Sequence, residues 1–337
     1  MASIASPCEP LVDSFGRVHS DMRISVTDRC NIRCFYCMPE ENVRFKPRDE
    51  LLTFEEIVRF VRIVAQMGIE TFRITGGEPL VRRNLDRLID MLAAVPGVRD
   101  LALTTNGILL AGQAEALRRA GLRRLNISLD AMNAETFRKI ARRDGFERIL
   151  EGITEAQRHG FDKIKLNAVA IRGLTEAEVV PLGRFARERG LELRFIEYMP
   201  LDAEGRWDMS QVLRGDEILR LLEAEFGRLV PKRPTNPSQP ACDYEFMDGG
   251  GVIGFINPVS QPFCADCDRL RLTAEGQVRN CLFSVVEWDA RQPLRGGAAD
   301  EVIANLVRDC VAAKKAGHGI NGQDFARPSR AMYQIGG

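Results

Sequence analysis

Three cysteines within eight residues are the part of this sequence best suited to chemistry. Cys30, Cys34 and Cys37 form a C-x3-C-x2-C run. A [4Fe–4S] cube held by three cysteines keeps one iron without a protein ligand, where a small molecule can coordinate. Structural zinc usually takes four closed ligands instead. The spacing favours a cluster with an open iron and leaves a zinc site or a coincidence as the alternatives.

A second group of three cysteines lies near the other end of the chain. Cys264 and Cys267 form a C-x2-C pair, and Cys281 follows after thirteen intervening residues. The group is compatible with a second cluster and equally with half of a zinc ribbon that Cys242 or His318 would complete. The remaining cysteines stand alone, and we expect them to be small buried apolar side chains: Cys8, Cys242 and Cys310.

A pair of adjacent glycines provides the second motif. The segment TGGEP spans residues 75–79 and contains Gly76, Gly77 and Glu78. Adjacent glycines let the backbone approach a ligand closely, and the exposed N–H and C=O groups can pair with a polar amino-acid head group. A Gly-Gly turn alone is common and indicates little. Its occurrence one strand after the first cysteine motif is much less common, so the two motifs together are a stronger indication of a shared ligand site.

These motifs follow short β-rich runs that alternate with helical patterns. We expect six strands, at residues 23–26, 72–75, 101–104, 125–129, 163–169 and 191–196. The clearest helix begins with a capping box at Thr53 and Glu56 and ends before Gly68. Six strand–helix units predict parallel strands joined by right-handed crossovers. Because polar motifs follow strand after strand, the pattern favours an α/β partial (β/α)6 TIM-like barrel with one shared cavity over an open doubly wound sheet.

The pattern changes after Gly227. The Pro-rich residues 231–240 predict a linker. Residues 249–255 and 269–282 resemble short strands, the latter a hairpin that turns at Glu275-Gly276, and a last helix is expected at residues 300–316. We therefore predict a partial barrel at residues 1–230 and a C-terminal cluster-binding extension at residues 231–337, which ends in two glycines.

The overall charge excludes several classes of function. Lys and Arg number 47 and Asp and Glu number 47, so the formal net charge is zero. This balance gives no overall attraction to nucleic acid or to an anionic membrane, and an anionic substrate needs a local basic site. The sequence shows neither an apolar run of membrane-spanning length nor a signal peptide. We expect a cytoplasmic protein, in which clustered cysteines more often bind metal than form disulfides.

At Cys30, Cys34, Cys37 and residues 76–79, the chain resembles the radical S-adenosylmethionine (SAM) superfamily, over about residues 22–199. The resemblance implies that the first cluster binds SAM through its open iron and injects an electron. SAM then breaks to methionine and a 5′-deoxyadenosyl radical, which abstracts hydrogen from the substrate. The resemblance assigns SAM contacts to six residues: Tyr36, Gly76, Gly77, Glu78, Ser128 and Met199.

The C-terminal part is similar to the GTP 3′,8-cyclases, the MoaA-type enzymes that begin molybdenum cofactor biosynthesis. The similarity rests on Cys264, Cys267, Cys281, the segment Asp-Arg-Leu-Arg at residues 268–271, and the Gly-Gly end. It implies a second [4Fe–4S] cluster on these three cysteines, with an open iron that contacts guanine. It assigns GTP contacts to Arg23, Arg73, Thr104, Lys165, Arg269, Leu270 and Arg271, and catalytic roles to Arg269, Arg271, Gly336 and Gly337.

Strand alternation independently places Arg269 and Arg271 on one face of an extended segment, and two guanidinium groups suit a triphosphate or a purine edge. The family often has a lysine where this chain has Thr71. One phosphate contact of the family is therefore missing here unless a neighbouring arginine supplies it.

The implied reaction converts GTP to (8S)-3′,8-cyclo-7,8-dihydroguanosine 5′-triphosphate. The radical removes hydrogen from ribose C3′, the carbon radical attacks purine C8, and the product radical is reduced and protonated. The implied partners are GTP, a flavodoxin-like or ferredoxin-like electron donor system, and a cyclic pyranopterin monophosphate synthase that receives the product. We expect no nucleic acid or membrane partner, and a homodimer is left open.

Two other functions compete with this interpretation. The first is another radical SAM enzyme with an auxiliary cluster, such as a peptide-modifying maturase. Such enzymes usually carry more C-terminal cysteines than the four that follow Cys242 here. The second is a zinc-stabilised binding module for nucleic acid, which the neutral charge disfavours.

Overall fold

Six parallel strands form the centre of the fold. The computed structural model describes residues 10–234, 236–323 and 325–336. The strands β1 to β6 pair in chain order, each parallel to the next. They are β1 (Asp21–Ser25), β2 (Thr71–Thr75), β3 (Asp100–Thr105), β4 (Arg124–Ser128), β5 (Lys163–Ala170) and β6 (Glu192–Glu197). All six overlap the strands expected from the sequence, and their order confirms the partial (β/α)6 barrel.

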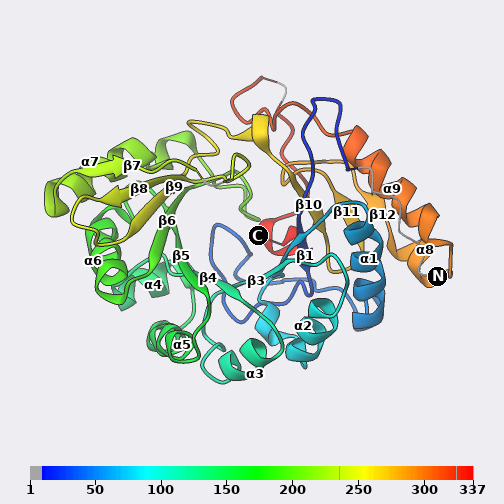
Figure 1. The fold of residues 1–337 in the computed structure, drawn as a ribbon. Helices are drawn as coiled ribbons and strands as arrows, with labels where there is room; N and C mark the ends of the chain where they lie inside the picture. Colours follow the sequence, from blue (N-terminus) through cyan, green and yellow to red (C-terminus); the bar gives the residue numbers. More distant parts are fainter. Residues whose placement is uncertain (1–9, 235, 324, 337) are drawn as a thin grey trace.

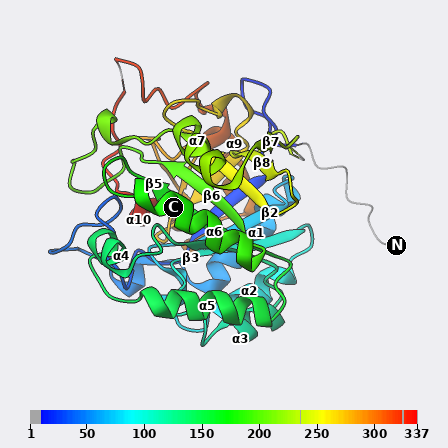
Figure 2. The ribbon, with the colours of Figure 1, turned by 90° about the vertical axis from the view of Figure 1, so that its left-hand side faces the viewer.

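Helices cover the outer side of these strands, and the strands curve around a centre in which the C-terminal end of the chain lies (Figure 1). Helices α3 and α5 lie side by side on this outer layer in both ribbon views (Figure 2). The helices that follow the strands are α1 (Phe54–Gln66), α2 (Leu85–Ala93), α3 (Ala114–Arg119), α4 (Ala134–Ala141), α5 (Phe146–Arg158), α6 (Val179–Arg189) and α7 (Gly215–Phe226).

Helix α1 shows how the sequence builds this layer. Thr53 Oγ1 accepts a hydrogen bond from the Glu56 N–H at 3.1 Å, and the Glu56 carboxylate accepts from the Thr53 N–H at 2.7 Å, which confirms the predicted capping box. Phe60 and Val61 are completely buried against the sheet. Burying such a side chain contributes about 1.5–3 kcal/mol. Gly68 follows with φ +94°, a conformation that disfavours continuation with an L-residue.

The C-terminal strands extend both edges of the same sheet. β9 (Val252–Ile256) pairs parallel with β6, and β10 (Arg269–Leu272) pairs parallel with β1. The outer strands are antiparallel additions: β7 (Leu229–Pro231), β8 (Cys242–Phe246), β11 (Gln277–Arg279) and β12 (Trp288–Asp289). The order is β12-β11-β10-β1-β2-β3-β4-β5-β6-β9-β8-β7, an unclosed sheet of twelve strands in the described residues.

Sequence patterns located some of these additions and missed others. The hairpin at Glu275-Gly276 is confirmed, with Gly276 at φ +88°. The linker expected at residues 231–240 begins inside β7, whose last residue is Pro231. Proline is tolerated there because β7 is an edge strand, where a missing N–H costs no ladder hydrogen bond. β7 and β8 were not predicted, since they are short and flank this Pro-rich segment.

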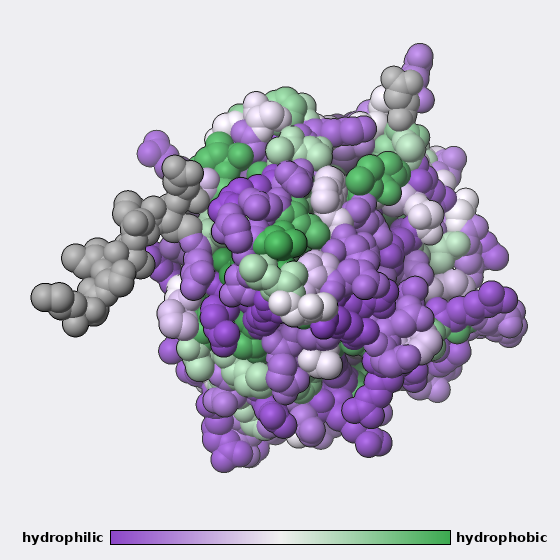
Figure 3. Space-filling model, turned by 90° about the vertical axis from the view of Figure 1, so that its right-hand side faces the viewer, coloured by the Kyte–Doolittle hydropathy of each residue, from purple (hydrophilic) through white to green (hydrophobic). Residues whose placement is uncertain are grey.

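Three helices complete the chain: α8 (Arg291–Arg295), α9 (Asp300–Ala312) and α10 (Met332–Ile335). Short 3-10 turns are η1 (Arg48–Glu50), η2 (Pro79–Val81), η3 (Glu176–Glu178), η4 (Met209–Gln211) and η5 (Cys264–Asp266). The face that carries α8 and α9 is mainly hydrophilic, with hydrophobic side chains in small areas (Figure 3). Within the described residues, no helix combines the length and apolar character needed to cross a membrane.

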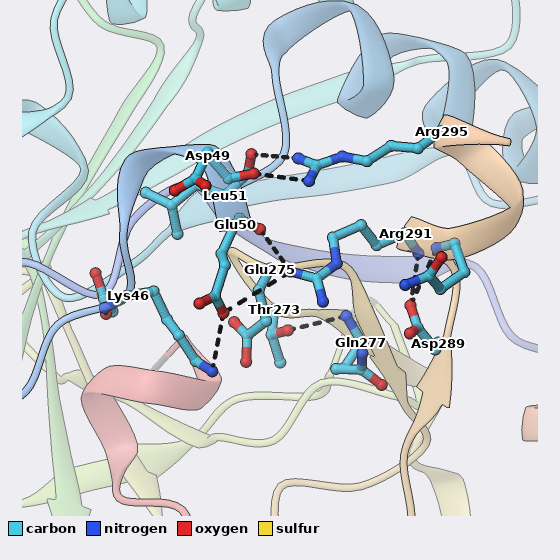
Figure 4. Close-up of polar contacts among 12 residues, drawn as sticks. Lys46, Asp49, Glu50, Leu51, Thr273, Glu275, Gln277, Asp289, Arg291 and Arg295 are labelled. Atoms are coloured by element: carbon cyan, nitrogen blue, oxygen red, sulfur yellow. Dashed lines mark hydrogen bonds and ion pairs between the residues drawn. The ribbon is translucent and has the colours of Figure 1, made fainter.

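The segment after the first cysteines is fixed to the C-terminal part (Figure 4). Arg295 donates to the main-chain oxygens of Asp49 and Leu51 at 2.7 and 2.9 Å, and Arg291 donates to the Glu50 oxygen at 3.1 Å. Both arginines lie on α8, which follows the segment with η5, β10 and β11 that contains the second cysteine group. The two cysteine-bearing regions are therefore tied together through main-chain contacts.

Candidate active site

A cavity of about 550 Å³ lies inside the curve of the strands. Mostly alternate residues of the strands face it, as the period of two along a strand predicts, and adjacent residues do so only at the ends of β3 and β6. The strand residues that line it are Asp21, Arg23, Thr71, Arg73, Thr75, Asp100, Thr104, Thr105, Arg124, Asn126, Ser128, Lys163, Lys165, Asn167, Val169, Arg194, Ile196, Glu197, Ile256, Arg269 and Arg271. The structure thus brings Arg23, Arg73, Thr104, Lys165, Arg269 and Arg271 to one cavity, as predicted.

The arginines of this cavity carry buried donors that the chain itself does not satisfy. Among the described residues, Arg23 Nε, Arg73 Nε and Arg269 Nη2 are buried without a hydrogen-bond partner. Burial lowers the pKa of Arg23 well below its usual value, and the charges of Arg271 and Arg73 lower it further. Unsatisfied buried donors and mutually repelling cations are costly. A multiply charged anion in the cavity would relieve both costs.

The cavity is also lined by two arginines that the sequence analysis did not predict. Arg124 Nε donates to Asp100 Oδ1 at 2.8 Å, and Arg194 Nε donates to Glu192 Oε1 at 2.8 Å. Each lies two residues before another cavity residue of its own strand, Asn126 or Ile196, so strict period-two reading of β4 and β6 would have found both. Both line the same cavity as Thr71, and each is paired with a carboxylate.

Lys165 is held at the cavity wall by a carboxylate. Its ammonium lies 2.7 Å from Glu192 Oε1, and Lys163 contacts Glu192 Oε2 at 2.6 Å. Burial lowers the pKa of Lys165 to about 7, and the Arg194 charge contributes to this shift. Lys165 therefore titrates close to neutral pH, and an anion beside it would favour its charged form.

The first cysteine group occupies a loop between β1 and α1. The N–H groups of Arg33 and Phe35 donate to the oxygens of Ala141 and Ile140, which fixes the loop to the end of α4. All three thiols are partly buried and line the cavity. Asn106 Nδ2 lies 3.7 Å from Cys30 Sγ. The predicted first group therefore converges on the cavity: Cys30, Cys34 and Cys37.

The glycine motif packs directly on this loop. A Cβ at Gly77 would lie 2.5 Å from the Arg29 oxygen, and one at Gly76 would lie 2.7 Å from the Thr27 oxygen. Gly77 N–H donates to the Thr27 oxygen at 2.7 Å. The close approach seen at both glycines is thus to the chain that leads into Cys30, and their approach to a ligand stays a prediction.

Glu78 orders the same corner of the cavity. Its carboxylate accepts hydrogen bonds from the Leu80 N–H at 3.0 Å, from Thr105 Oγ1 at 2.7 Å and from the Asn106 N–H at 2.7 Å. Burial raises the pKa of Glu78 to about 7. The residue joins the end of β3 to the glycine motif and positions Asn106 toward Cys30.

The other predicted SAM residues lie around the first cysteine loop. Tyr36 donates from its hydroxyl to Asp130 Oδ2 at 2.7 Å, and Asp130 Oδ1 accepts from the Val169 N–H at 2.8 Å. Ser128 and Met199 also line the cavity. All six predicted SAM residues thus line the same cavity, and their contacts with SAM stay a prediction.

The second cysteine group borders the cavity through its neighbours. Asp268, Arg269, Arg271 and Leu282 line the cavity, whereas the lining residues do not include Cys264, Cys267 or Cys281. Burial raises the pKa of Cys264, and the nearby Cys281 and Cys267 raise it further. Burial also acts to raise the pKa of Cys267, but Arg269 and Lys314 hold it below its usual value. Cys267 therefore lies near the positive charges of Arg269 and Lys314.

The donor chemistry of both groups fits [4Fe–4S] clusters. Burial raises the pKa of Cys30 to about 11, and burial followed by nearby negative groups raises that of Cys34. When one buried thiol ionises, its negative charge raises the pKa of the thiols beside it. A cationic iron core would stabilise all three as thiolates. Among the described residues, no three His, Cys, Asp or Glu side chains come close enough to hold one metal ion.

The C-terminal tail reaches the strand ends. Arg271 Nη1 donates to the Gly336 oxygen, and Gly336 N–H donates to the Met332 oxygen at 3.1 Å. Gly337 lies outside the described residues. Leu270 is completely buried in the apolar core and is not among the residues that line the cavity, so a GTP contact there would use its main chain. Arg269 and Arg271, the residues before and after Leu270 in β10, both face the cavity, as strand alternation predicts.

The single cysteines differ in their surroundings. Cys310 is completely buried in the core, as expected. Cys242 is exposed at the start of β8, the strand next to the edge strand β7, so its expected burial is wrong. A strand this close to the sheet edge has little cover from other elements, which leaves alternate side chains in contact with solvent. Cys8 lies outside the described residues.

Comparison with known proteins agrees with this architecture. Residues 24–186 match the radical SAM superfamily, and residues 191–320 match the family Molybdenum Cofactor Synthesis C. Solved structures show the same fold. Streptococcus suis SuiB bound to S-adenosylmethionine is 14% identical with a TM-score of 0.61, over 87% of this chain and 68% of that one. Native anSMEcpe with bound AdoMet is 15% identical with a TM-score of 0.58, over 93% of this chain and 93% of that one.

Curated relatives match nearly the whole chain. A GTP 3′,8-cyclase of Rhodopirellula baltica is 53% identical over 97% of this chain and 92% of the relative. A GTP 3′,8-cyclase of Mycobacterium sp. strain KMS is 46% identical over 97% and 94%. The chain belongs to the GTP 3′,8-cyclase family, within the radical SAM superfamily.

Proposed function

We propose that this protein is a GTP 3′,8-cyclase, a radical SAM lyase that converts GTP to (8S)-3′,8-cyclo-7,8-dihydroguanosine 5′-triphosphate in molybdenum cofactor biosynthesis. The observation that carries the proposal is the convergence of buried, unsatisfied arginine donors and the first cysteine group on one cavity. The relatives named GTP 3′,8-cyclase support the same reaction. The peptide-modifying alternative has only fold-level neighbours in its favour.

The chain would bind two [4Fe–4S] clusters and SAM. Cys30, Cys34 and Cys37 would hold the first cluster, as the superfamily implies. Cys264, Cys267 and Cys281 would hold the second. When bound, these groups supply the electron and the 5′-deoxyadenosyl radical that removes hydrogen from the substrate.

The cavity side chains bind and orient the nucleotide. Arg23 and Arg73 present buried Nε donors to the triphosphate, and Lys165 adds a cation whose charge the phosphates stabilise. Arg269 and Arg271 hold the guanine end beside the second cysteine group. In this proposal the ribose would lie between the two cysteine groups, and the surrounding strands would limit the access of water to it.

The tail closes the cavity on one side. Arg271 fixes the Gly336 oxygen, and Tyr333 and Met332 line the cavity. Glycine leaves room at a place where a Cβ would meet Thr75 Oγ1 at 2.5 Å. We propose that Gly336 assists the radical step by keeping Arg271 oriented toward the substrate; the catalytic role expected for Gly337, which lies outside the described residues, stays a prediction.

The test combines GTP binding with product analysis. Anaerobically reconstituted protein, given GTP, SAM and a reductant, is expected to form 5′-deoxyadenosine and the cyclised nucleotide only when GTP is present. Arg73→Met should weaken GTP binding by about 10- to 150-fold, because a charged hydrogen bond contributes about 1.5–3 kcal/mol. The control is Arg99→Met, since the Arg99 side chain is 75% exposed. GTP-independent SAM cleavage, or equal GTP affinity in both variants, would contradict the proposal.

The surroundings of the enzyme remain proposals as well. We propose a flavodoxin-like or ferredoxin-like reductase system as electron donor and a cyclic pyranopterin monophosphate synthase as the consumer of the product. A cytoplasmic location fits this chemistry, because both clusters and free thiols need a reducing compartment. The division into a barrel at residues 1–230 and an extension at residues 231–337 also stays a prediction.

A further inference from the structure

One lysine is buried beside the second cysteine group. Lys314 lies two residues after the end of α9 and is only 5% exposed. Lysine is almost never fully buried unless its charge is paired. Five other lysines each contact a glutamate: Lys46, Lys139, Lys163, Lys165 and Lys232. The burial of Lys314 therefore needs a negative partner of its own.

That partner is not a carboxylate. Within the described part of the chain, no Asp or Glu oxygen lies within 4.0 Å of the Lys314 ammonium. The ammonium donates to the Arg269 oxygen at 2.9 Å and lies 3.7 Å from Cys267 Sγ, a normal distance for an N–H···S hydrogen bond. The Cys267 sulfur, as a thiolate, is the negative group that the geometry offers to Lys314.

The contact is held from the other side by an arginine. Arg17 Nη1 donates to the Cys264 oxygen at 2.7 Å, and its Nη2 donates to the Lys315 oxygen at 2.8 Å. Asp13 Oδ2 accepts from Arg17 Nε at 2.6 Å and fixes its orientation. The chain that carries Lys314 is thereby joined to the loop that carries the second cysteine group, and the Lys314–Cys267 distance is set by the fold.

We propose that Lys314 is a positioning residue for the second [4Fe–4S] cluster, which donates a hydrogen bond to the Cys267 ligand and raises the reduction potential of that cluster. The proposal rests on the proposed function, because it requires a cluster on Cys264, Cys267 and Cys281. Reduction adds one electron to the cluster, and no bond to Lys314 forms or breaks. A fixed cation and an N–H···S bond stabilise the more negative reduced state most.

The test isolates the second cluster in the full chain. Cys30→Ala, Cys34→Ala and Cys37→Ala together remove the first cluster, and this parent is reconstituted with iron and sulfide. Dithionite supplies the electron in a titration followed by electron paramagnetic resonance. Lys314→Met should make reduction at least about tenfold less favourable, which is 59 mV for one electron. Lys314→Arg keeps the charge and should stay close to the parent.

Lys315→Met is the matched control, because Lys315 is the exposed neighbour and contributes only its main-chain oxygen to Arg17. Equal potentials for the parent and Lys314→Met would overturn the inference. Lys314→Met could also fail to retain iron. In that case, retention of iron by both Lys314→Arg and Lys315→Met supports the pairing of Lys314 with Cys267. Loss of iron from Lys315→Met as well overturns it. A parent that binds no iron instead contradicts the proposed second cluster itself.

Discussion

The docked C-terminal tail gives a prediction that follows from geometry alone. Gly336 has φ +83° and ψ +96°, and a Cβ there would lie 2.5 Å from Thr75 Oγ1 and 3.0 Å from Ser25 Cβ. Gly336→Ala therefore adds backbone strain of about 1–3 kcal/mol and overpacking of about 1–3 kcal/mol. The sum is at least about 2 kcal/mol, which reduces docked tail relative to undocked tail by about 30-fold or more.

The assay is amide hydrogen exchange of the C-terminal peptide, read by mass spectrometry. Gly336→Ala should accelerate exchange of the tail amides by that factor and reduce formation of the cyclised product, since Arg271 loses the Gly336 oxygen. Gly173→Ala is the matched control, because Gly173 has φ +76° but nothing within 4 Å of an added Cβ. Unchanged tail protection in Gly336→Ala would refute the docked position.

Three further perturbations follow from the structure. Thr53→Ala removes the cap of α1 and should cost about 1 kcal/mol of unfolding free energy; an unchanged denaturation midpoint would argue against the capping box. Burial lowers the pKa of Lys165 from 10.5 in the unfolded chain to about 7, so the ligand-free fold gains stability as pH rises from 7 to 10.5. GTP affinity should instead fall about fivefold between pH 7 and 8, because Lys165 loses its positive charge over this range. Calorimetry should find that fall absent in Lys165→Arg, which stays charged. Glu78→Gln should lower the unfolding free energy more at pH 5 than at pH 8, because burial raises the pKa of Glu78 from 4.5 to about 7, so the wild-type fold loses stability as Glu78 ionises with rising pH, whereas the neutral Gln does not; an equal loss at both values would contradict this role.

The sequence predicted the parts of the fold that repeat. The six strands and the α1 cap follow from local periodicity and capping chemistry, which neighbouring residues determine. The pairing of β9 with β6 and of β10 with β1 could not be predicted in the same way. Those contacts join distant segments, and the short strands β7 and β8 carry too few residues for a periodic signal.

The site residues likewise include some that local sequence predicts and some that only the fold brings together. Cys30, Cys34 and Cys37 are local in sequence and were found by spacing, whereas the gathering of Arg23 and Arg73 in one cavity rested on family resemblance and strand alternation. Lys314 carries no motif, and only the fold places it near Cys267.

The zero net charge hides a local excess of positive charge. Eight Arg and Lys side chains and six Asp and Glu side chains line the cavity. The cavity nevertheless gathers buried guanidinium groups whose Nε donors have no partner in the described residues. Composition can therefore exclude a general polyanion binder while leaving a concentrated site for a small anion.

The most direct test of the account follows a single hydrogen atom. The reconstituted enzyme is incubated anaerobically with SAM, reductant and GTP deuterated at C3′, and the 5′-deoxyadenosine is analysed by mass spectrometry. The account predicts one deuterium in the 5′-deoxyadenosine and a cyclised nucleotide formed with it. Deuterium that stays on recovered GTP while unlabelled 5′-deoxyadenosine accumulates would contradict it.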